Sequence, residues 1–383
     1  MLATESRPAA TAHQHYRRGI ASRGLRRIAR APEWRVFLPL LILWIALSIS
    51  QSTFLTSRNI TNLLFESAVV GVMAVGTTGV LITGEIDLSL GAVEGLSGIM
   101  AAIAMTSWHG GWLAGVVVAL ATGVIVGLLN GFFTARLRIP SFIVTLAMLG
   151  VATGVADIAS GGLTIYNFPP SFLVIGQGGI GEFTYPIFIS VGVAILLHLL
   201  LRHTRIGLMF YGVGSNASAA DLIGISVRRV KIIAFVVSGL CAAIGGIMVT
   251  AELGAANPEL GSENLLNAIA AVIIGGTALT GGEGSILGTA LGVLIITSIS
   301  DGLDLLNVNP FWQQFVIGLV ILGVGGVGVL TARGAMPSPF TRLLGRLTHR
   351  DGGRPANGGN APAAAGDEVT QTPKRTTRRE GTR

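Results

Sequence analysis

Residues 81–91 read Leu81-Ile82-Thr83-Gly84-Glu85-Ile86-Asp87-Leu88-Ser89-Leu90-Gly91, a stretch that places two carboxylates between long apolar runs. The runs on either side, residues 63–82 and 88–105, are each about as long as a helix that crosses a membrane. The chain therefore has to turn between two helices at residues 84–87. Because a charge at the centre of a bilayer costs roughly 2.5–3.5 kcal/mol, both acids should face a protein interior, a water-filled path or the membrane surface rather than lipid.

Composition places the chain among integral membrane proteins. Of its 383 residues, 51% are hydrophobic and only 12% are charged, whereas a soluble domain carries about 25% charged residues. The 54 glycines suit close helix packing in lipid. A net charge of +7 could fit a nucleic-acid-binding protein, but the basic residues lie almost wholly in the two tails and in short loops. This distribution indicates membrane topology, and no nucleic acid partner is expected.

Ten apolar segments predict an all-α polytopic membrane protein with about ten transmembrane helices. They cover approximately residues 36–51, 63–83, 88–106, 112–134, 141–160, 185–201, 231–251, 265–279, 284–300 and 312–332. An even number of spans puts both termini on one side. If that side is the cytoplasm, every lysine and arginine except Arg58 lies there, as the positive-inside rule requires. The predicted organisation is a disordered, basic cytoplasmic tail at 1–35, a transmembrane domain at 36–333 and a disordered, basic cytoplasmic tail at 334–383, because neither tail can bury a core.

Two of these segments carry glycine at every fourth position, which places the glycines on one helix face and predicts close contact with a neighbouring helix. They are Gly123, Gly127 and Gly131 in one segment, and Gly284, Gly288 and Gly292 in the other. The loops on the outer side are acidic. They carry Glu182, Glu252, Glu259, Glu263, Asp301 and Asp304. These acids are either neutral to topology or a docking surface for a partner with basic residues on its face.

The connection at 202–229 is too long to be a simple turn. Asn216 or Ser215 can cap a short helix within it, and Gly224 can end that helix. The helix would carry a small apolar face made of Ala219, Ala220, Leu222 and Ile223. Such a helix either docks into a groove on a cytoplasmic partner or packs against its own chain as an amphipathic connector.

The hydrolase motifs G-x-S-x-G and H-E-x-x-H are absent from the sequence, and residues 323–328, which match the dinucleotide motif G-x-G-x-x-G, follow no predicted strand and lie in an apolar segment. The chain has two lysines, Lys231 and Lys374, and neither follows a phosphate-binding G-x-x-x-x-G-K-[ST] loop. The six histidines are scattered and predict no metal site. We therefore expect no enzyme activity, no metal and no cofactor on this chain.

Several stretches together resemble the ribose-type permease subunits of bacterial ABC importers. They are residues 81–91, 130–146, the connection at 202–229, residues 268–285, and Phe311-Trp312-Gln313-Gln314. The resemblance runs in order from about residue 36 to residue 330. It implies a ten-span fold in the bacterial cytoplasmic membrane, two permease copies that form a path, separate ATPase subunits that bind ATP, and an extracytoplasmic substrate-binding protein.

The resemblance also implies where the ATPase is contacted. Ser218-Ala219-Ala220, followed by Gly224, corresponds to the short coupling motif that sits in the ATPase cleft. The coupling loop then comprises Asn216, Ser218, Ala219, Ala220, Asp221 and Gly224.

This sequence departs from the pattern of that family at three places. Glu85 stands where a second glycine is usual, Glu94 stands where an apolar or small residue is usual, and residues 264–267 lack the usual aromatic and acids. On a helix Asp87 and Glu94 share one face with three glycines. The two acids either form internal hydrogen bonds or line the path and select hydroxyl-rich or weakly cationic cargo. The candidate path residues are Glu85, Asp87, Ser89, Glu94, Asn130, Asn267 and Gln313.

The sequence thus predicts a permease subunit that moves a ribose-like monosaccharide by alternating access. Two alternatives stay open at this point. The cargo could be a branched-chain amino acid, a nucleoside or another small polar molecule. The chain could instead be an ion-coupled secondary transporter that uses Glu85, Asp87 and Glu94 as a proton or sodium site.

Overall fold

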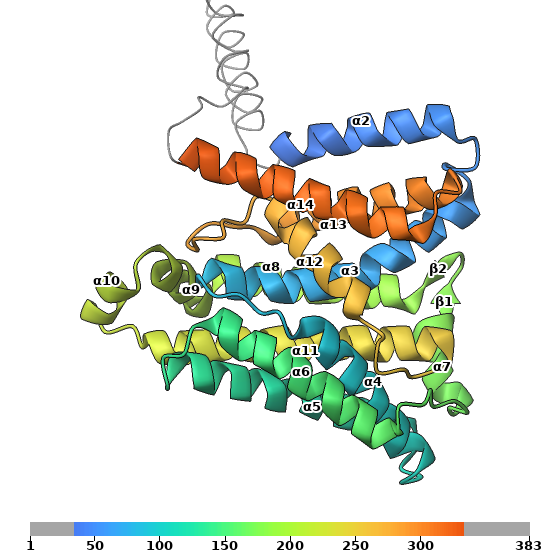
Figure 1. Ribbon diagram of the computed structural model, residues 1–383, viewed down its shortest axis with the longest axis horizontal. Coiled ribbons are helices and arrows are strands. Elements are labelled where there is room, and N and C mark those ends of the chain that lie inside the picture. The colour runs from blue at the N-terminus through green and yellow to red at the C-terminus, as the bar shows by residue number, and fades with distance from the viewer. Residues whose placement is uncertain (1–33, 333–383) are drawn as a thin grey trace, which may run out of the picture. The chain divides into compact units, whose positions relative to one another are not determined.

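The computed structural model describes residues 34–332. The predicted tail at 334–383, and all of the tail at 1–35 except its last two residues, lie outside this range. Within it the chain is almost entirely helical, and the helices discussed below belong to the unit that ends at Val329 (Figure 1). The helices are α2 (Trp34–Ser50), α3 (Ser57–Ile82), α4 (Leu90–Thr106), α5 (Gly111–Ala135), α6 (Ser141–Ser160), α7 (Pro170–Gln177), α8 (Tyr185–His203), α9 (Arg205–Ser215), α10 (Ala217–Leu222), α11 (Val227–Leu253), α12 (Ser262–Ile274), α13 (Ile286–Leu305) and α14 (Pro310–Ala332).

Each of the ten predicted spans coincides with a helix in the described residues, but the helices differ in length. Six of them, α3, α5, α6, α8, α11 and α13, are long and apolar enough to cross a membrane. The apolar parts of the other four, in α2, α4, α12 and α14, are 10–17 residues long. The structure therefore confirms a helical membrane protein with six candidate spans, whereas the count of ten and the side on which the termini lie remain predictions.

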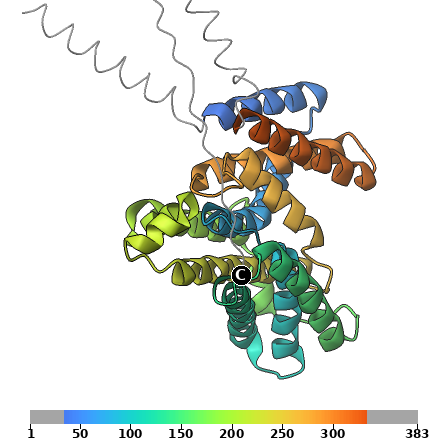
Figure 2. The same ribbon diagram turned by 60° about the vertical axis from the view of Figure 1, so that its left-hand side comes forward.

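The long helices run along a common direction and separate two ends of the unit. In Figure 1, α9 and α10 lie at one end of α8 and α11, and α7 and the small hairpin lie at the other end. The hairpin pairs β1 (Gly179–Ile180) with β2 (Phe183–Thr184) in antiparallel register. Figure 2 shows α9 and α10 again grouped together to one side of the long helices. We call the end that carries α10 the inner end and the end that carries the hairpin the outer end.

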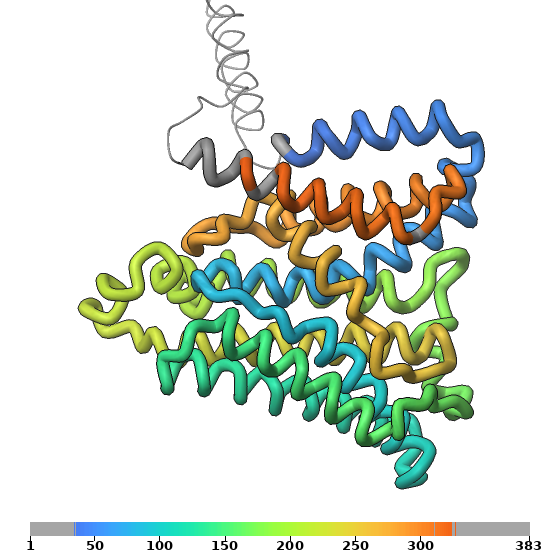
Figure 3. Tube along the Cα trace, viewed as in Figure 1, coloured from blue at the N-terminus to red at the C-terminus, as the bar shows by residue number. Residues whose placement is uncertain are grey.

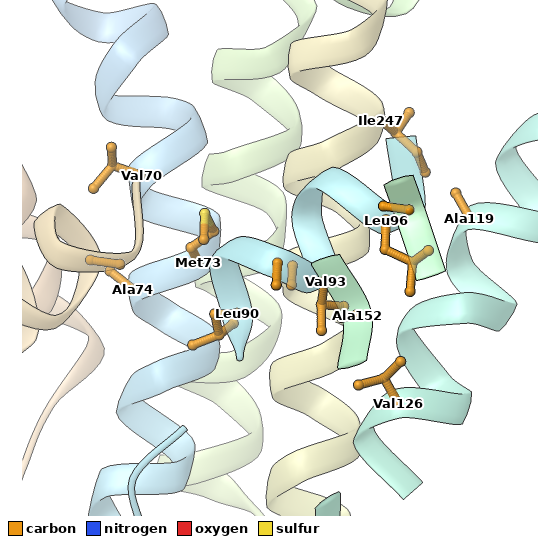
Figure 4. Packing of buried hydrophobic residues seen from close by; sticks show 14 of the residues in the cluster. Val70, Met73, Ala74, Leu90, Val93, Leu96, Ala119, Val126, Ala152 and Ile247 are labelled. Atoms are coloured by element: carbon orange, nitrogen blue, oxygen red, sulfur yellow. The ribbon is translucent and has the colours of Figure 1, made fainter. Parts of the chain in front are cut away.

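The core is built around α3, α4 and α11. Figure 4 shows Val70 and Met73 of α3 beside Leu90 and Val93 of α4, with α5, α6 and α11 around them. The apolar window of α3 is 83% buried, whereas that of α8 is only 17% buried. Because exposing so large an apolar surface to water is energetically unfavourable, α8 and the similarly exposed α5 and α6 present their outward faces to lipid.

Glycine lets helix backbones touch at the predicted places. A Cβ atom on Gly123 would lie 2.2 Å from the carbonyl oxygen of Gly239, and one on Gly127 would lie 2.5 Å from that of Phe235, so the glycine face of α5 packs directly on α11. Likewise, a Cβ atom on Gly292 of α13 would lie 2.0 Å from the carbonyl oxygen of Ala271 in α12. The second face is shorter than predicted, because α13 begins at Ile286 and Gly284 lies before it, with φ +159°.

The helix bundle is broken at two places, one inside a predicted span and one at the predicted turn. Within the predicted span 265–279, helix α12 ends at Ile274. It ends there because Gly276 takes a left-handed φ of +88° and residues 275–285 form a loop. The chain turns at the predicted place between α3 and α4, where Gly84 has φ +79° (Figure 3). Residues 83–89 are not helical, so both breaks leave backbone polar groups that need partners inside the helix bundle.

The contact between α5 and α11 predicts a sharp difference between two glycine substitutions. Gly239→Leu should destabilise the protein by at least about 3 kcal/mol, because its Cβ would lie 2.2 Å from the backbone oxygen of Gly123, which cannot move without separating the helices. Gly154→Leu on α6 is the matched control, since a Cβ there meets no atom within 4 Å. The measurement is the midpoint of unfolding in detergent on titration with sodium dodecyl sulfate. Equal midpoints for the two variants would contradict the packing described here.

Candidate functional site

The break between α3 and α4 is held by a buried network centred on Asp87. Its Oδ1 atom accepts hydrogen bonds from the backbone N–H of Ser89 at 3.0 Å and from the Ser89 hydroxyl at 2.6 Å. Its Oδ2 atom accepts from the hydroxyl of Ser238 on α11 at 2.8 Å. Asn130 of α5 donates in turn to Ser89 Oγ at 2.8 Å. All four side chains are buried, so this network joins three helices rather than facing a cavity.

The backbone of the break is satisfied by side chains of α6 and by a distant loop. Ser141 Oγ accepts from the N–H of Ile86 at 3.1 Å, and Thr145 Oγ1 donates to the carbonyl of Ile86 at 3.3 Å. The carbonyl of Ile82 accepts from the N–H of Gly282 at 2.9 Å. The N–H and carbonyl of Ile86 and the carbonyl of Ile82 thus have partners, as irregular backbone within a membrane protein requires.

Glu85 faces the inner end of the bundle and is paired. Its carboxylate forms an ion pair with the ammonium group of Lys231, in the second turn of α11. The unusual acid at this position therefore has a charge partner, and it lies on the side of the break away from the outer end.

The predicted short helix exists as α10. Asn216 Oδ1 accepts from the N–H of Ala219 at 2.9 Å and caps the helix, and Gly224 ends it with φ +86°. The predicted apolar face is divided, however. Ala220 is 4% exposed and packs against its own chain, whereas Leu222 is 89% exposed and Ile223 is 78% exposed. Ala219 is exposed as well, so only Ala220 of the four packs inward, and the large apolar side chains of Leu222 and the C-cap residue Ile223 are exposed at the inner end.

Helix α9 connects α10 to the two breaks. A Cβ on Gly214 would lie 1.8 Å from the carbonyl oxygen of Ile82 and 2.6 Å from the nitrogen of Gly282, so the end of α9 touches both backbones directly. Tyr211 of α9 donates a hydrogen bond to the carbonyl of Gly284 at 2.9 Å. Burial raises the pKa of Tyr211, so the hydroxyl keeps its proton and remains a donor. We call the contact among Ile82, Gly214 and Gly282 the glycine junction.

A polar cavity of about 260 Å³ lies toward the outer end, among α3, α11, α12, α13 and α14. Its polar lining consists of Glu66, Glu263, Asn264, Asn267, Thr297, Ser300, Asp304 and Gln313. We call it the outer cavity. Three carboxylates and three carboxamides line it, and no lysine, arginine or histidine does. This lining can accept hydrogen bonds from hydroxyl groups and disfavours an anion.

Two predicted path residues, Asn267 and Gln313, line the outer cavity. Gln313 donates to the carboxylate of Asp304, whereas the carboxamide of Asn267 forms no hydrogen bond with another described residue. An unpaired carboxamide in a cavity is available to a ligand.

Glu94 reaches the outer cavity only through a second side chain. Its Oε1 atom accepts from Asn264 at 3.0 Å, and Asn264 lines the cavity. Its Oε2 atom has no partner among the described residues, and the whole side chain is buried. Glu94 of α4 and Asn264 of α12 are therefore in direct contact.

The structure thus divides the predicted path residues among separate places. Asp87, Ser89 and Asn130 form one buried network, Glu85 lies at the inner end, and Asn267 and Gln313 share the outer cavity. Ser238, Glu66 and the role of Lys231 as the partner of Glu85 were not predicted from the sequence. Only Lys231 carried a signal, because it is the sole lysine in the transmembrane domain. Among residues 34–332, no group of three or more histidines, cysteines or acids could hold a metal ion.

Comparison with known proteins gives consistent results. The chain is 38% identical over 286 residues to an L-arabinose ABC transporter permease protein of Azospirillum brasilense, which covers 74% of this chain and 83% of that protein. It is 37% identical over 294 residues to a ribose import permease protein of Escherichia coli, covering 76% and 91% of the two chains. It is 33% identical over 334 residues to a xylose transport system permease protein of Haemophilus influenzae, covering 71% and 89%. The search of solved structures found no match.

A family profile described as the permease component of branched-chain amino acid transport systems matches residues 59–325, which is well over half of the chain. This match contains the α3–α4 break, α10 and the outer cavity. It confirms the resemblance found in the sequence, and with the six long apolar helices it makes the chain a multi-pass protein of the bacterial cytoplasmic membrane. The chain belongs to this permease family of ABC transport systems.

Proposed function

We propose that this chain is the membrane-spanning subunit of an ABC importer that carries a ribose-like monosaccharide into the cell. The observation that carries the proposal is the similarity, over about three quarters of the chain, to permeases named for ribose and L-arabinose. The outer cavity supports it, because carboxylates and carboxamides are good acceptors for sugar hydroxyl groups. Its volume of about 260 Å³ suits a small cargo.

The proposed topology has ten spans with both termini in the cytoplasm. The four short apolar helices are then spans too, and α4 and α12 are short because each adjoins a break in the bundle. The distribution of basic residues supports this topology, since Arg138, Arg228 and Lys231 all lie at the end that carries α10.

The proposed partners are ATPase subunits, a second permease copy and an extracytoplasmic binding protein. The large apolar side chains of Leu222 and Ile223, exposed beside the charged residues of the inner end rather than on a lipid-facing helix, support contact with an ATPase. No covalent chemistry and no cofactor are assigned to this chain, and ATP is bound by its partner.

Transport would proceed by alternating access. ATP-driven closure of the ATPase subunits would displace α10, and α9 would pass that displacement to the glycine junction. Both breaks meet at this junction, so α4 and α12, which bear on the outer cavity through Glu94 and Asn264, would shift relative to α3. Binding in the cavity should be weak, because tight binding would prevent release.

The cargo proposal is tested by uptake. Cells that lack their own pentose permeases and produce this chain with its ATPase and binding protein should accumulate labelled ribose, arabinose or xylose. An inactive ATPase should abolish accumulation. Preferential uptake of labelled leucine or uridine would overturn the sugar assignment. Transport by the purified chain alone, driven by a proton or sodium gradient, would show a secondary transporter instead.

The outer cavity makes a prediction for two of its lining residues. Gln313→Leu should lower the initial rate of sugar uptake about tenfold, because a sugar hydroxyl in the cavity would lose a hydrogen-bond partner. Gln51→Leu, in the connection between α2 and α3, is the control, since Gln51 does not line the cavity. Asn267→Leu should behave like Gln313→Leu. Normal uptake in both cavity variants, at normal protein levels, would remove the cavity from the path.

The proposed contact with the ATPase is tested at the exposed residues of α10. Leu222→Asp and Ile223→Asp should prevent co-purification of the ATPase and leave folding unchanged, because both side chains are largely exposed. Leu163→Asp, in the connection after α6, is the control, since it is also an apolar side chain 70% exposed. Retention of the ATPase by the double variant L222D/I223D would place the contact elsewhere.

A further inference from the structure

A second cavity, of about 770 Å³, lies at the inner end beside α10, and its lining includes Glu85 and the coupling-loop residues Ser218, Asp221 and Gly224. We call it the inner cavity. It is enclosed by the end of α5 and the connection to α6, by α10, and by the beginning of α11. Its volume falls within the range of about 300–1,000 Å³ that is usual for ligand pockets.

The residues that line the inner cavity carry a net positive charge once the ion pair between two of them is discounted. Glu85 lines it but is neutralised by Lys231, which lines it as well. Arg138 and Arg228 also line it, and neither forms an ion pair with any carboxylate among the described residues. Asp221 is the one other acid in the lining, so two free guanidinium groups face one free carboxylate.

The start of α11 adds further donors to the same cavity. Residues 224–228 line it, and α11 is 27 residues long with no acid in its first turn. The side chain of the N-cap residue Ser226 makes no capping hydrogen bond. The first N–H groups of a helix have no partner within the helix, and together with the helix dipole they favour an anion.

A buried hydroxyl gives independent support for a missing ligand. Thr134, near the end of α5, lines the cavity and is only 6% exposed. Its Oγ1 atom has no hydrogen-bond partner among the described residues, although a buried polar group without a partner costs about 1–3 kcal/mol. This atom is shielded from the cavity in the structure, and rotation of the Thr134 side chain would bring it to a ligand oxygen there.

We propose that the inner cavity binds a phosphate group, contacted by Arg138, Arg228 and the first turn of α11. Guanidinium groups and helix N-termini are both suited to phosphate. The cavity is larger than a phosphate ion, so the group belongs to an anionic lipid headgroup or to a soluble phosphorylated molecule. By joining the α5–α6 connection to the start of α11, the bound phosphate fixes the position of α10 between them.

The test measures protection of an introduced thiol in the full-length protein. Ser218→Cys lines the cavity, and Leu222→Cys on the same helix does not, while the native Cys241 is buried and gives little background. Both variants are placed in phosphatidylcholine nanodiscs and labelled with a maleimide. Inorganic phosphate, or replacement of part of the lipid by phosphatidylglycerol, should slow labelling of Ser218→Cys several-fold and leave Leu222→Cys unchanged. If S218C itself disturbs the cavity, Ala217→Cys serves as the reporter, since Ala217 also lines it.

Arginine variants identify the contacts. Arg138→Gln or Arg228→Gln should raise the ligand concentration needed for half-protection roughly tenfold, because each removes a charged hydrogen bond. Arg136→Gln and Arg229→Gln are the matched controls, since these neighbouring arginines do not line the cavity. Protection by phosphatidylglycerol alone identifies a lipid headgroup, and protection by phosphate identifies a soluble ligand. Absence of protection by either, equal protection by sodium chloride at the same ionic strength, or protection that persists when both Arg138 and Arg228 are replaced would overturn the proposal.

Discussion

The requirement that polar backbone groups inside a membrane protein find partners governs this structure. The chain stops being helical between α3 and α4, deep among the other helices, and a carboxylate lies in the gap. Asp87 is tolerated there because Ser89 and Ser238 fill its hydrogen-bonding positions, and the backbone of Ile86 is satisfied by side chains of α6. The same bonds fix α3, α4, α6 and α11 to one another. A charge that would be costly in lipid therefore becomes a fixed connection between helices.

The arrangement around this break supports the proposed coupling between the two ends of the bundle. Toward the inner end, α9 touches the carbonyl of Ile82 through Gly214, and α10 follows α9 directly. Toward the outer end, Glu94 of α4 holds Asn264, which lines the outer cavity. Direct backbone contact without intervening side chains transmits small displacements, because there are no flexible side chains to absorb them. The breaks and the close glycine contacts are thus parts of one mechanical connection.

Much of this fold could be predicted because it depends on local patterns. Apolar length identified ten helices to within a few residues, Asn216 and Gly224 marked the limits of α10, and the glycine spacing of α5 identified its packing face. These features follow from the period of a helix and from the chemistry of caps. Length alone could not separate a full span from a helix that ends early, since α12 stops at Gly275 within a continuous apolar run.

The sequence by itself determined the membrane class, the positions of the helices, the turn at residues 84–87 and the capped helix of the long connection. The tertiary structure decided which polar side chains meet. Asp87 and Ser238 are 151 residues apart, Glu85 and Lys231 are 146 apart, and Glu94 and Asn264 are 170 apart. Helical periodicity shows which side of one helix a residue occupies but not which neighbour that side faces. Only the packing of helices shows that the predicted path residues separate into a buried network, an ion pair and a cavity lining.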